Sequence, residues 1–264
     1  MSAVVETALN GDVRLAYEVH GEGQPLLLMH GLGYGRWGWE PLVAPLAERF
    51  RVVLYDNRGI GASDNPPGPY TAVELAEDAA AVLDAAGLRT AHVLGTSLGG
   101  MAAQELALGW PDRVDRLVLA CTTPGGANAY PLPEPTQRLF AEAWAFEPEA
   151  RLRRFVENAL APGAREDLVA RITALRLAHP PDPDGWQAQA AAGASHDAFD
   201  RLEAVAAPTL VVHGTEDAVV DPRNSELLAD RIPKAQLEWI EGAGHLFFWE
   251  QPERFVSLIE EFLA

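Results

Sequence analysis

Short apolar runs alternate with segments of helical spacing along most of this 264-residue chain, and this alternation limits its fold more than any other feature. The expected strands span 25–29, 51–55, 91–95, 116–121, 208–213 and 236–241. The expected helices span 39–48, 71–86, 98–109, 222–232 and 252–263. Strands that alternate with helices in this way predict a parallel α/β sheet.

The beginning of the chain adds two strands to this sheet. Residues 4–8 and 13–19 are β-prone, and Asn10-Gly11 between them predicts a hairpin turn. Further along, Thr71 followed by Glu74 forms a capping box that marks the start of the second helix. We therefore predict an α/β fold with a mostly parallel, twisted, eight-stranded sheet flanked by helices.

One long stretch, 124–206, breaks the alternation. It is rich in Pro, Ala and Arg and has no β-branched strand runs. Its larger apolar residues are spaced as in amphipathic helices: Phe140, Trp144, Phe155, Leu160, Leu168, Ile172 and Leu175. A stretch of roughly 80 residues is too long for a structureless loop in a compact domain. We expect a core of residues 1–123 and 207–264, with 124–206 inserted as a helical cap over the carboxyl edge of the sheet.

The charge of the chain restricts its partners. The net charge of −18 repels phosphate backbones and anionic membranes, so we expect neither nucleic acid nor membrane as a partner. Met1 to Asn10 lacks the basic and apolar regions of a signal peptide, and no run approaches the ~18 apolar residues of a membrane span. We expect a cytoplasmic monomer or homodimer. The single cysteine, Cys121, lies in an apolar run and is expected to be buried.

The segment Gly95-Thr96-Ser97-Leu98-Gly99-Gly100 lies between an expected strand and an expected helix. In such a tight turn only glycine avoids clashes two residues before and two residues after the serine. Ser97 would adopt a strained conformation that exposes its hydroxyl, beside helix N–H groups that favour negative charge. The alternative is a phosphate-binding turn. No second phosphate-binding feature accompanies it, and Lys234, the only lysine, lies far downstream. We predict that Ser97 is a nucleophile.

A serine nucleophile needs a base, and seven histidines are candidates. His245 follows Gly242-Ala243-Gly244, directly after the last expected strand, which would bring it level with Ser97. His92 and His213 lie in or at the ends of strands, where structural roles are expected. The same holds for His30, as a hydrogen-bonding residue. We therefore predict His245 as the base.

The imidazole in turn needs a carboxylate that fixes its tautomer. Asp217 lies in the loop after the penultimate strand, which we expect beside His245. Glu216 and Asp221 remain alternatives, although Asp221 has a ready structural role as the N-cap before Pro222. Asp56 is expected to stabilise its own turn.

Two loops and the cap complete the predicted site. The loop His30-Gly31-Leu32-Gly33 follows an early strand, and the backbone N–H groups of Leu32 and Leu98 would form an oxyanion hole. Aromatic residues that could line the substrate cleft are Trp37, Phe140, Trp144, Trp186 and Phe247. The alternative for most of them is packing inside the cap. Those that face the cleft would favour small to medium apolar groups.

Taken together, these residues resemble the α/β-hydrolase fold superfamily, which uses the same chain order of serine, acid and histidine. The segments Gly95 to Gly109, Asp56-Asn57-Arg58-Gly59 and Gly242-Ala243-Gly244-His245 are most similar to small bacterial carboxylesterases and 3-oxoadipate enol-lactonase-like hydrolases. The resemblance implies hydrolysis of a small-molecule ester or lactone through an acyl-enzyme on Ser97, without cofactor or metal.

The residue at the sharp turn, Ser97, distinguishes this chain from some other members of the superfamily. Haloalkane dehalogenases and epoxide hydrolases use a carboxylate nucleophile, so Ser97 excludes them. Hydrolases that cleave the C–C bond of ring-cleavage diketones share the fold and the triad and remain open. Cofactor-free perhydrolases usually carry proline where this chain has Gly33, which disfavours them without excluding them. A ligand-binding receptor of this fold is the alternative outside the enzymes.

Overall fold

The computed structural model describes residues 4–264, apart from the side chain of Trp144. Eight strands form one sheet in the order β1-β2-β4-β3-β5-β6-β7-β8. They are β1 (Glu6–Asn10), β2 (Val13–His20), β3 (Gln24–Met29), β4 (Phe50–Tyr55), β5 (Ala91–Thr96), β6 (Val114–Ala120), β7 (Thr209–Gly214) and β8 (Ala235–Ile240). Only the pairs β1/β2 and β2/β4 are antiparallel. The predicted eight-stranded, mostly parallel sheet is confirmed.

The opening hairpin differs from the prediction in its turn. Asn10 pairs with Val13, so the two turn residues are Gly11 and Asp12 rather than Asn10 and Gly11. Gly11 takes the positive φ of 59° that such a turn requires. Asn10 remains in the strand, and its side-chain amide donates a 2.9 Å hydrogen bond to Asp78 of helix α2 (Ala72–Ala85).

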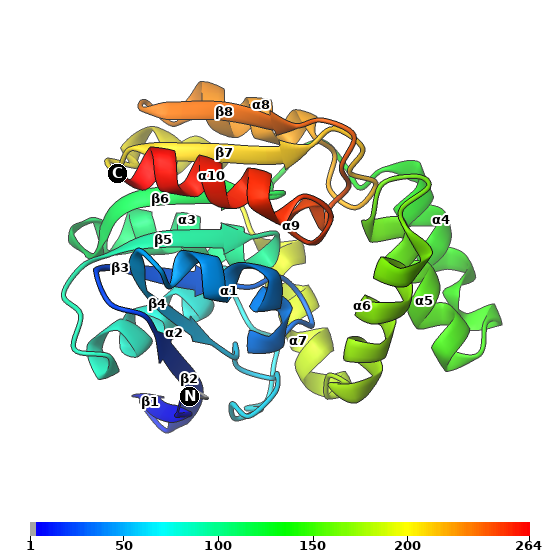
Figure 1. The fold of residues 1–264 in the computed structure, drawn as a ribbon, viewed down its shortest axis with the longest axis horizontal. Coiled ribbons are helices and arrows are strands. Elements are labelled where there is room, and N and C mark those ends of the chain that lie inside the picture. The colour runs from blue at the N-terminus through cyan, green and yellow to red at the C-terminus, as the bar shows by residue number, and fades with distance from the viewer. Residues whose placement is uncertain (1–3) are drawn as a thin grey trace.

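Helices cover both faces of the sheet, which explains why the central strands are apolar throughout. Along β3, Leu27 packs into one core while Leu26 and Leu28 pack into the other, as the alternation of a strand requires. One face carries α2 (Ala72–Ala85), α3 (Leu98–Gly109) and α8 (Arg223–Arg231); the other carries α1 (Glu40–Leu46), α9 (Phe247–Glu250) and α10 (Pro252–Leu263) (Figure 1). The predicted capping box of Thr71 and Glu74 starts α2.

The stretch between β6 and β7 is helical, as predicted. It contains α4 (Glu134–Glu142), α5 (Pro148–Ala159), α6 (Glu166–Ala178) and α7 (Pro183–Ser195), with 3₁₀ helices η3 (Ala143–Ala145) and η4 (Phe199–Ala204). Helices α4 to α6 lie beyond the carboxyl ends of the strands, whereas α7 lies against the core near α2 and α3 (Figure 1). The boundaries at residues 124 and 206 stay a prediction. No helix in residues 4–264 is long and apolar enough to cross a membrane.

Candidate active site

Ser97 lies at the sharp turn from β5 into α3. Its φ of 53° and ψ of −120° are a strained conformation for a residue other than glycine. A Cβ on Gly95 would overlap the Gly99 carbonyl, and a Cβ on Gly99 would overlap the Met29 carbonyl. The predicted need for glycine on both sides of the serine is therefore confirmed.

The end of β6 holds this turn in place. The Ser97 N–H donates to the Ala120 carbonyl over 2.9 Å, and the Thr122 hydroxyl donates to the Ser97 carbonyl over 2.7 Å. Cys121, which lies between Ala120 and Thr122, is buried as predicted, and burial raises the pKa of its thiol. A thiol that stays protonated is a weak nucleophile, so Cys121 is not a candidate for the reactive group.

His245 and Asp217 are brought together as the sequence predicts. Nδ1 of His245 donates a 2.7 Å hydrogen bond to Oδ2 of Asp217, since an ionised carboxylate can only accept. The other carboxylate oxygen, Oδ1, accepts from the backbone N–H groups of Val219 and Val220, at 2.7 and 2.9 Å. These bonds orient a buried acid toward the imidazole, and within residues 4–264 no hydrogen bond joins Nε2 of His245 to another group.

Electrostatics keeps this acid ionised. Burial alone would raise the pKa of Asp217, but the charge and hydrogen bonds of His245 and His213 outweigh burial and hold the pKa well below its usual range. The two alternative acids lie elsewhere: Glu216 is exposed, and Asp221 pairs with Arg223 at 2.6 Å. Asp221 also accepts from the Arg223 N–H, close to the capping role predicted for it, although α8 begins at Arg223.

Asp217 has a second histidine partner that was not predicted from the sequence. His213, fully buried at the end of β7, donates from Nε2 to Oδ2 of Asp217 over 2.9 Å. Its Nδ1 lies 2.6 Å from the Ser225 hydroxyl, which can donate to it. The signal was the spacing: His213 and Asp217 are four residues apart across the end of a strand. The acid therefore has a partner on each side.

The loop after β3 passes directly against Ser97. A Cβ on Gly31 would lie only 3.0 Å from Cβ of Ser97. His30 accepts from the Gly31 N–H over 2.7 Å, and burial above all lowers its pKa to about 3. His30 is thus a neutral structural residue, as predicted. Within residues 4–264, no acceptor is bonded to the N–H of Leu32 or of Leu98, so both donors are available.

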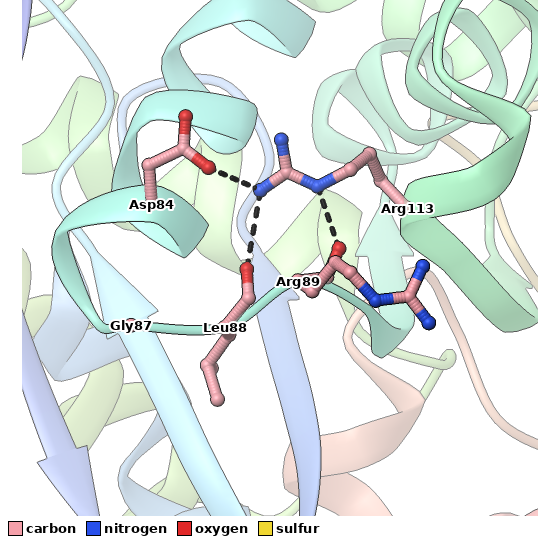
Figure 2. Close-up of a pocket in the computed structure, with 5 residues that line it drawn as sticks. All are labelled: Asp84, Gly87, Leu88, Arg89 and Arg113. Atoms are coloured by element: carbon pink, nitrogen blue, oxygen red, sulfur yellow. Dashed lines mark hydrogen bonds and ion pairs between the residues drawn. The ribbon is translucent and has the colours of Figure 1, made fainter.

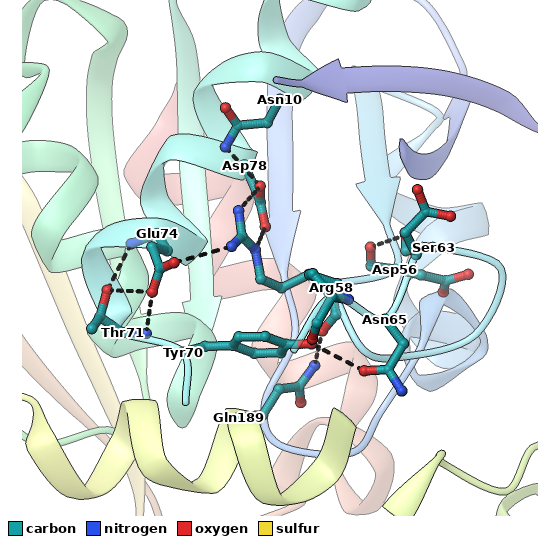
Figure 3. A network of polar contacts seen from close by, with 12 residues as sticks. Asn10, Asp56, Arg58, Ser63, Asn65, Tyr70, Thr71, Glu74, Asp78 and Gln189 are labelled. Carbon is teal, nitrogen blue, oxygen red and sulfur yellow. Dashed lines mark hydrogen bonds and ion pairs between the residues drawn. The ribbon is translucent and has the colours of Figure 1, made fainter. Parts of the chain in front are cut away.

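Helix α7 holds Gly33 of this loop, a contact that was not predicted from the sequence. The side chain of Gln189 is fully buried and accepts from the Gly33 N–H over 3.2 Å. It also donates to the Arg58 carbonyl over 2.8 Å. Arg58 is itself held by two bonds of 2.6 and 2.7 Å to Asp78 (Figure 3). One amide thus connects the loop after β3 to a rigid polar network.

Two of the predicted substrate-binding aromatics lie at the loop after β3: Trp37 belongs to it, and Trp186 packs against it. Trp186 of α7 lies over Gly33, where a Cβ would come within 2.9 Å of the indole Cδ1. Trp37 stacks on His179, which follows α6, with 5.7 Å between ring centroids. Both side chains are partly exposed and lie where the cap meets the loop. Their substrate-binding role stays a prediction.

The other three aromatics are placed differently. Phe247 is wrong as a cleft residue: it is fully buried and packs edge-on against Phe255 of α10, because the short α9 turns it toward the core. Phe140 is exposed and packs against Phe155 of α5, which fits packing between helices of the cap. The side chain of Trp144 lies outside the described part of the chain.

A surface hollow elsewhere on the molecule carries no such chemistry. It has a volume of about 330 Å³ and lies where α2 ends and β5 approaches, at the amino edge of the sheet (Figure 2). Arg113 lines it and donates to Asp84 and to the carbonyls of Leu88 and Arg89. Because these bonds occupy its N–H groups, the guanidinium has a structural role. The candidate site therefore remains at the opposite, carboxyl edge of the sheet.

Comparisons with known proteins agree with this arrangement. A family model described as the alpha/beta hydrolase fold matches residues 24–252. A relative from Azorhizobium caulinodans that bears the name carbamate hydrolase RutD is 34% identical over 266 residues, with 96% of each chain covered. A solved hydrolase from Pseudomonas aeruginosa PA01 is 34% identical, with a TM-score of 0.86 and 98% of both chains covered. The solved enol-lactonase from Burkholderia xenovorans LB400 is 26% identical, with a TM-score of 0.86 and coverage of 98% of this chain and 99% of that chain. This chain therefore belongs to the α/β-hydrolase family and is a hydrolase.

Proposed function

We propose that this hydrolase cleaves carboxylic esters or lactones through an acyl-enzyme on Ser97. The observation that carries the proposal is the 2.7 Å bond between Nδ1 of His245 and Asp217, an acid whose pKa is held low although it is buried. A carboxylate that stays ionised fixes the tautomer of the ring, so that Nε2 can accept a proton. The strained turn at Ser97 supports the role of this serine as the nucleophile.

The first half-reaction forms the acyl-enzyme. Oγ of Ser97 attacks the substrate carbonyl while Nε2 of His245 takes the hydroxyl proton. The carbonyl oxygen becomes an oxyanion, which the backbone N–H groups of Leu32 and Leu98 stabilise. The tetrahedral intermediate then collapses: the bond to the alcohol oxygen breaks, and His245 returns its proton to that leaving oxygen.

The second half-reaction releases the acid. His245 removes a proton from a water molecule, whose oxygen attacks the acyl carbon on Ser97. Collapse of this second intermediate breaks the bond to the serine oxygen, which regains the proton from His245. Asp217 remains ionised throughout and stabilises the imidazolium. No step requires a metal or cofactor.

The names of two relatives support chemistry at an acyl carbon. The enol-lactonase acts on a cyclic ester, and the carbamate hydrolase name of the other relative makes carbamates a second candidate class of substrate. Both classes present a carbonyl that a serine can attack. A carbamate would leave a carbamoyl-enzyme on Ser97, so the two candidates differ in the mass of the adduct.

A substrate panel tests the proposal. Short aryl esters, γ- and δ-lactones, aryl carbamates and ring-cleavage diketones are offered to the wild-type protein and to the Ser97→Ala variant. We expect turnover of esters or lactones by the wild type and a loss of about 10³-fold or more in the variant. Turnover of diketones alone, or full ester activity in Ser97→Ala, would overturn the proposal.

A further inference from the structure

Arg176, near the end of α6, reaches over the loop that follows β3. Its guanidinium lies 4.6 Å from the ring centroid of Tyr34, and one terminal nitrogen would lie 3.7 Å from a Cβ on Gly33. Gly33 directly follows Leu32, whose N–H is the proposed oxyanion donor. A full positive charge from the cap is therefore placed beside the proposed active site.

This charge has no acidic partner, although the chain carries a net charge of −18. Within the described part of the chain, no hydrogen bond or ion pair joins Arg176 to a carboxylate, and its Nε is buried without an acceptor. On the same helix, Arg171 pairs with Glu40 at 2.7 Å. Of the two arginines of α6, only Arg176 lacks an acid.

Stacking on Tyr34 does not satisfy this side chain. A cation–π contact uses the face of the planar guanidinium, whereas its five N–H donors point outward in the plane of the group. Such a fork matches a carboxylate, which accepts two parallel hydrogen bonds. An aromatic ring that fixes the guanidinium while its N–H edge stays free is suited to binding an anion.

We propose that Arg176 binds an anionic group of the substrate, and that the preferred substrates are esters or lactones that carry a carboxylate. The proposal rests on the proposed function and adds a substrate class to it. It also replaces the purely apolar substrate expected from the cap aromatics. The aromatic rings of Tyr34 and Trp186 then form the walls between the reacting carbonyl and the anion.

One short loop separates the two groups. Oγ of Ser97 would lie 3.5 Å from a Cβ on Gly31, and a terminal nitrogen of Arg176 would lie 3.7 Å from a Cβ on Gly33. Two residues of chain add at most about 7 Å between these glycines, so a small molecule that lies along the loop can reach both groups. Mono-esters of succinic, glutaric and adipic acids vary the length between the carbonyl and the carboxylate.

Matched pairs of esters test the proposal on the wild-type protein. Ethyl hydrogen succinate, glutarate and adipate are compared with ethyl butanoate, pentanoate and hexanoate, in which a methyl group replaces the carboxylate. Acetyl esters of short hydroxy acids, compared with acetyl esters of simple alcohols, place the charge on the leaving group instead. We expect kcat/KM to favour the anionic member by about tenfold or more in one of the two series.

Variants assign the preference to Arg176. Arg176→Gln should lower the anionic-to-neutral ratio of kcat/KM by about 10- to 100-fold, mainly through KM, because the charge binds substrate and transition state alike. Arg176→Lys should restore part of the ratio. The matched control is Arg171→Gln, which removes the same charge from the same helix and should leave the ratio unchanged.

The outcomes separate this proposal from the proposed function. Hydrolysis of neutral esters with no anionic preference in either series would overturn the role of Arg176 and leave the ester hydrolase intact. An unchanged ratio in Arg176→Gln would also overturn it, since a purely structural role lowers both rates together. Hydrolysis of no ester in either series would overturn the proposed function itself.

Discussion

Nε2 of His213 lies 2.9 Å from Oδ2 of Asp217, the same carboxylate oxygen that accepts from His245. The buried acid is therefore held by His213 of β7 while it orients the proposed base, His245. Ser225, at the other edge of the His213 ring, extends this chain of hydrogen bonds into α8. These connected hydrogen bonds fix the acid between β7, the loop after β8 and α8.

His213 should therefore position the acid. Removing its donor in His213→Leu should lower kcat about tenfold, because Asp217 loses one of its four hydrogen bonds and its pKa rises toward the ordinary carboxyl value. His213→Gln, which can still donate an N–H, should recover part of the activity. The pH profile of kcat/KM and urea unfolding of both variants are the measurements. The control is His92→Leu, a buried histidine of β5 that bonds Gln24 instead. Equal losses in His92→Leu and His213→Leu would show a general packing effect.

The identity of the acid makes a second prediction. Asp217→Asn should lower kcat by about 10³- to 10⁴-fold, because an amide no longer stabilises the imidazolium or fixes its tautomer. Asp221→Asn should change activity by less than about twofold, since Asp221 bonds Arg223 at the surface. Steady-state kinetics on the same ester decide between them, and the reverse order of effects would reassign the acid.

The cap helix α7 makes a third prediction. Gln189→Met keeps the shape of the side chain but removes its bonds to the Gly33 N–H and the Arg58 carbonyl. We expect kcat to fall about tenfold with little change in KM, because the loop that carries the proposed oxyanion donor Leu32 would shift. Complete loss of an oxyanion donor lowers the rate by more, about 10²–10³-fold. Gln187→Met is the matched control, since Gln187 is exposed on the same helix. A rise in KM with unchanged kcat would place Gln189 in substrate binding instead.

Glu105 on α3 makes one contribution to the pH dependence of stability. Burial alone would raise its pKa from 4.5, but His196 and Arg201 lower it to about 2. The pKa of Glu105 is lower in the folded chain than in the unfolded chain, so the ionised carboxylate stabilises the fold. This stabilisation is complete above pH ~5 and is lost as the pH falls toward 2. The difference of pKa corresponds to at most about 3 kcal/mol.

Urea unfolding from pH 7 to pH 3 measures this contribution. The free energy of unfolding of the wild type should fall more steeply below pH ~5 than that of Glu105→Gln. Glu157→Gln is the control, because Glu157 forms an exposed ion pair with Arg153 and should leave the slope unchanged. Parallel curves for the wild type and Glu105→Gln would contradict the prediction.

Much of the fold could be predicted because its signals are local. The strands, the turn at Ser97 and the loops that carry Asp217 and His245 each depend on neighbouring residues, and parallel strands bring their carboxyl ends to one edge. His213 was missed for a different reason. A histidine in a strand carries no sign of which buried acid it will face, so its bond to Asp217 depends on the loop geometry.

The contacts of the cap could not be predicted from the sequence. Gln189 bonds Gly33 from 156 positions further along the chain, and Arg176 reaches the same loop from another helix. No local pattern fixes how such helices rotate against the core. Phe247 failed similarly: its place after His245 suggested the cleft, but the short helix α9 directs it into the core.

Labelling by an activated phosphonate tests the central claim, that Ser97 is an activated nucleophile, most directly. A fluorophosphonate is incubated with the wild type, with Ser97→Ala and with Ser195→Ala, an exposed serine on α7. Intact mass and peptide mapping then locate the adduct. We predict one adduct per chain on Ser97 in the wild type and in Ser195→Ala, and none in Ser97→Ala. Stoichiometric labelling that persists in Ser97→Ala, or a wild-type adduct on another residue, would contradict the account.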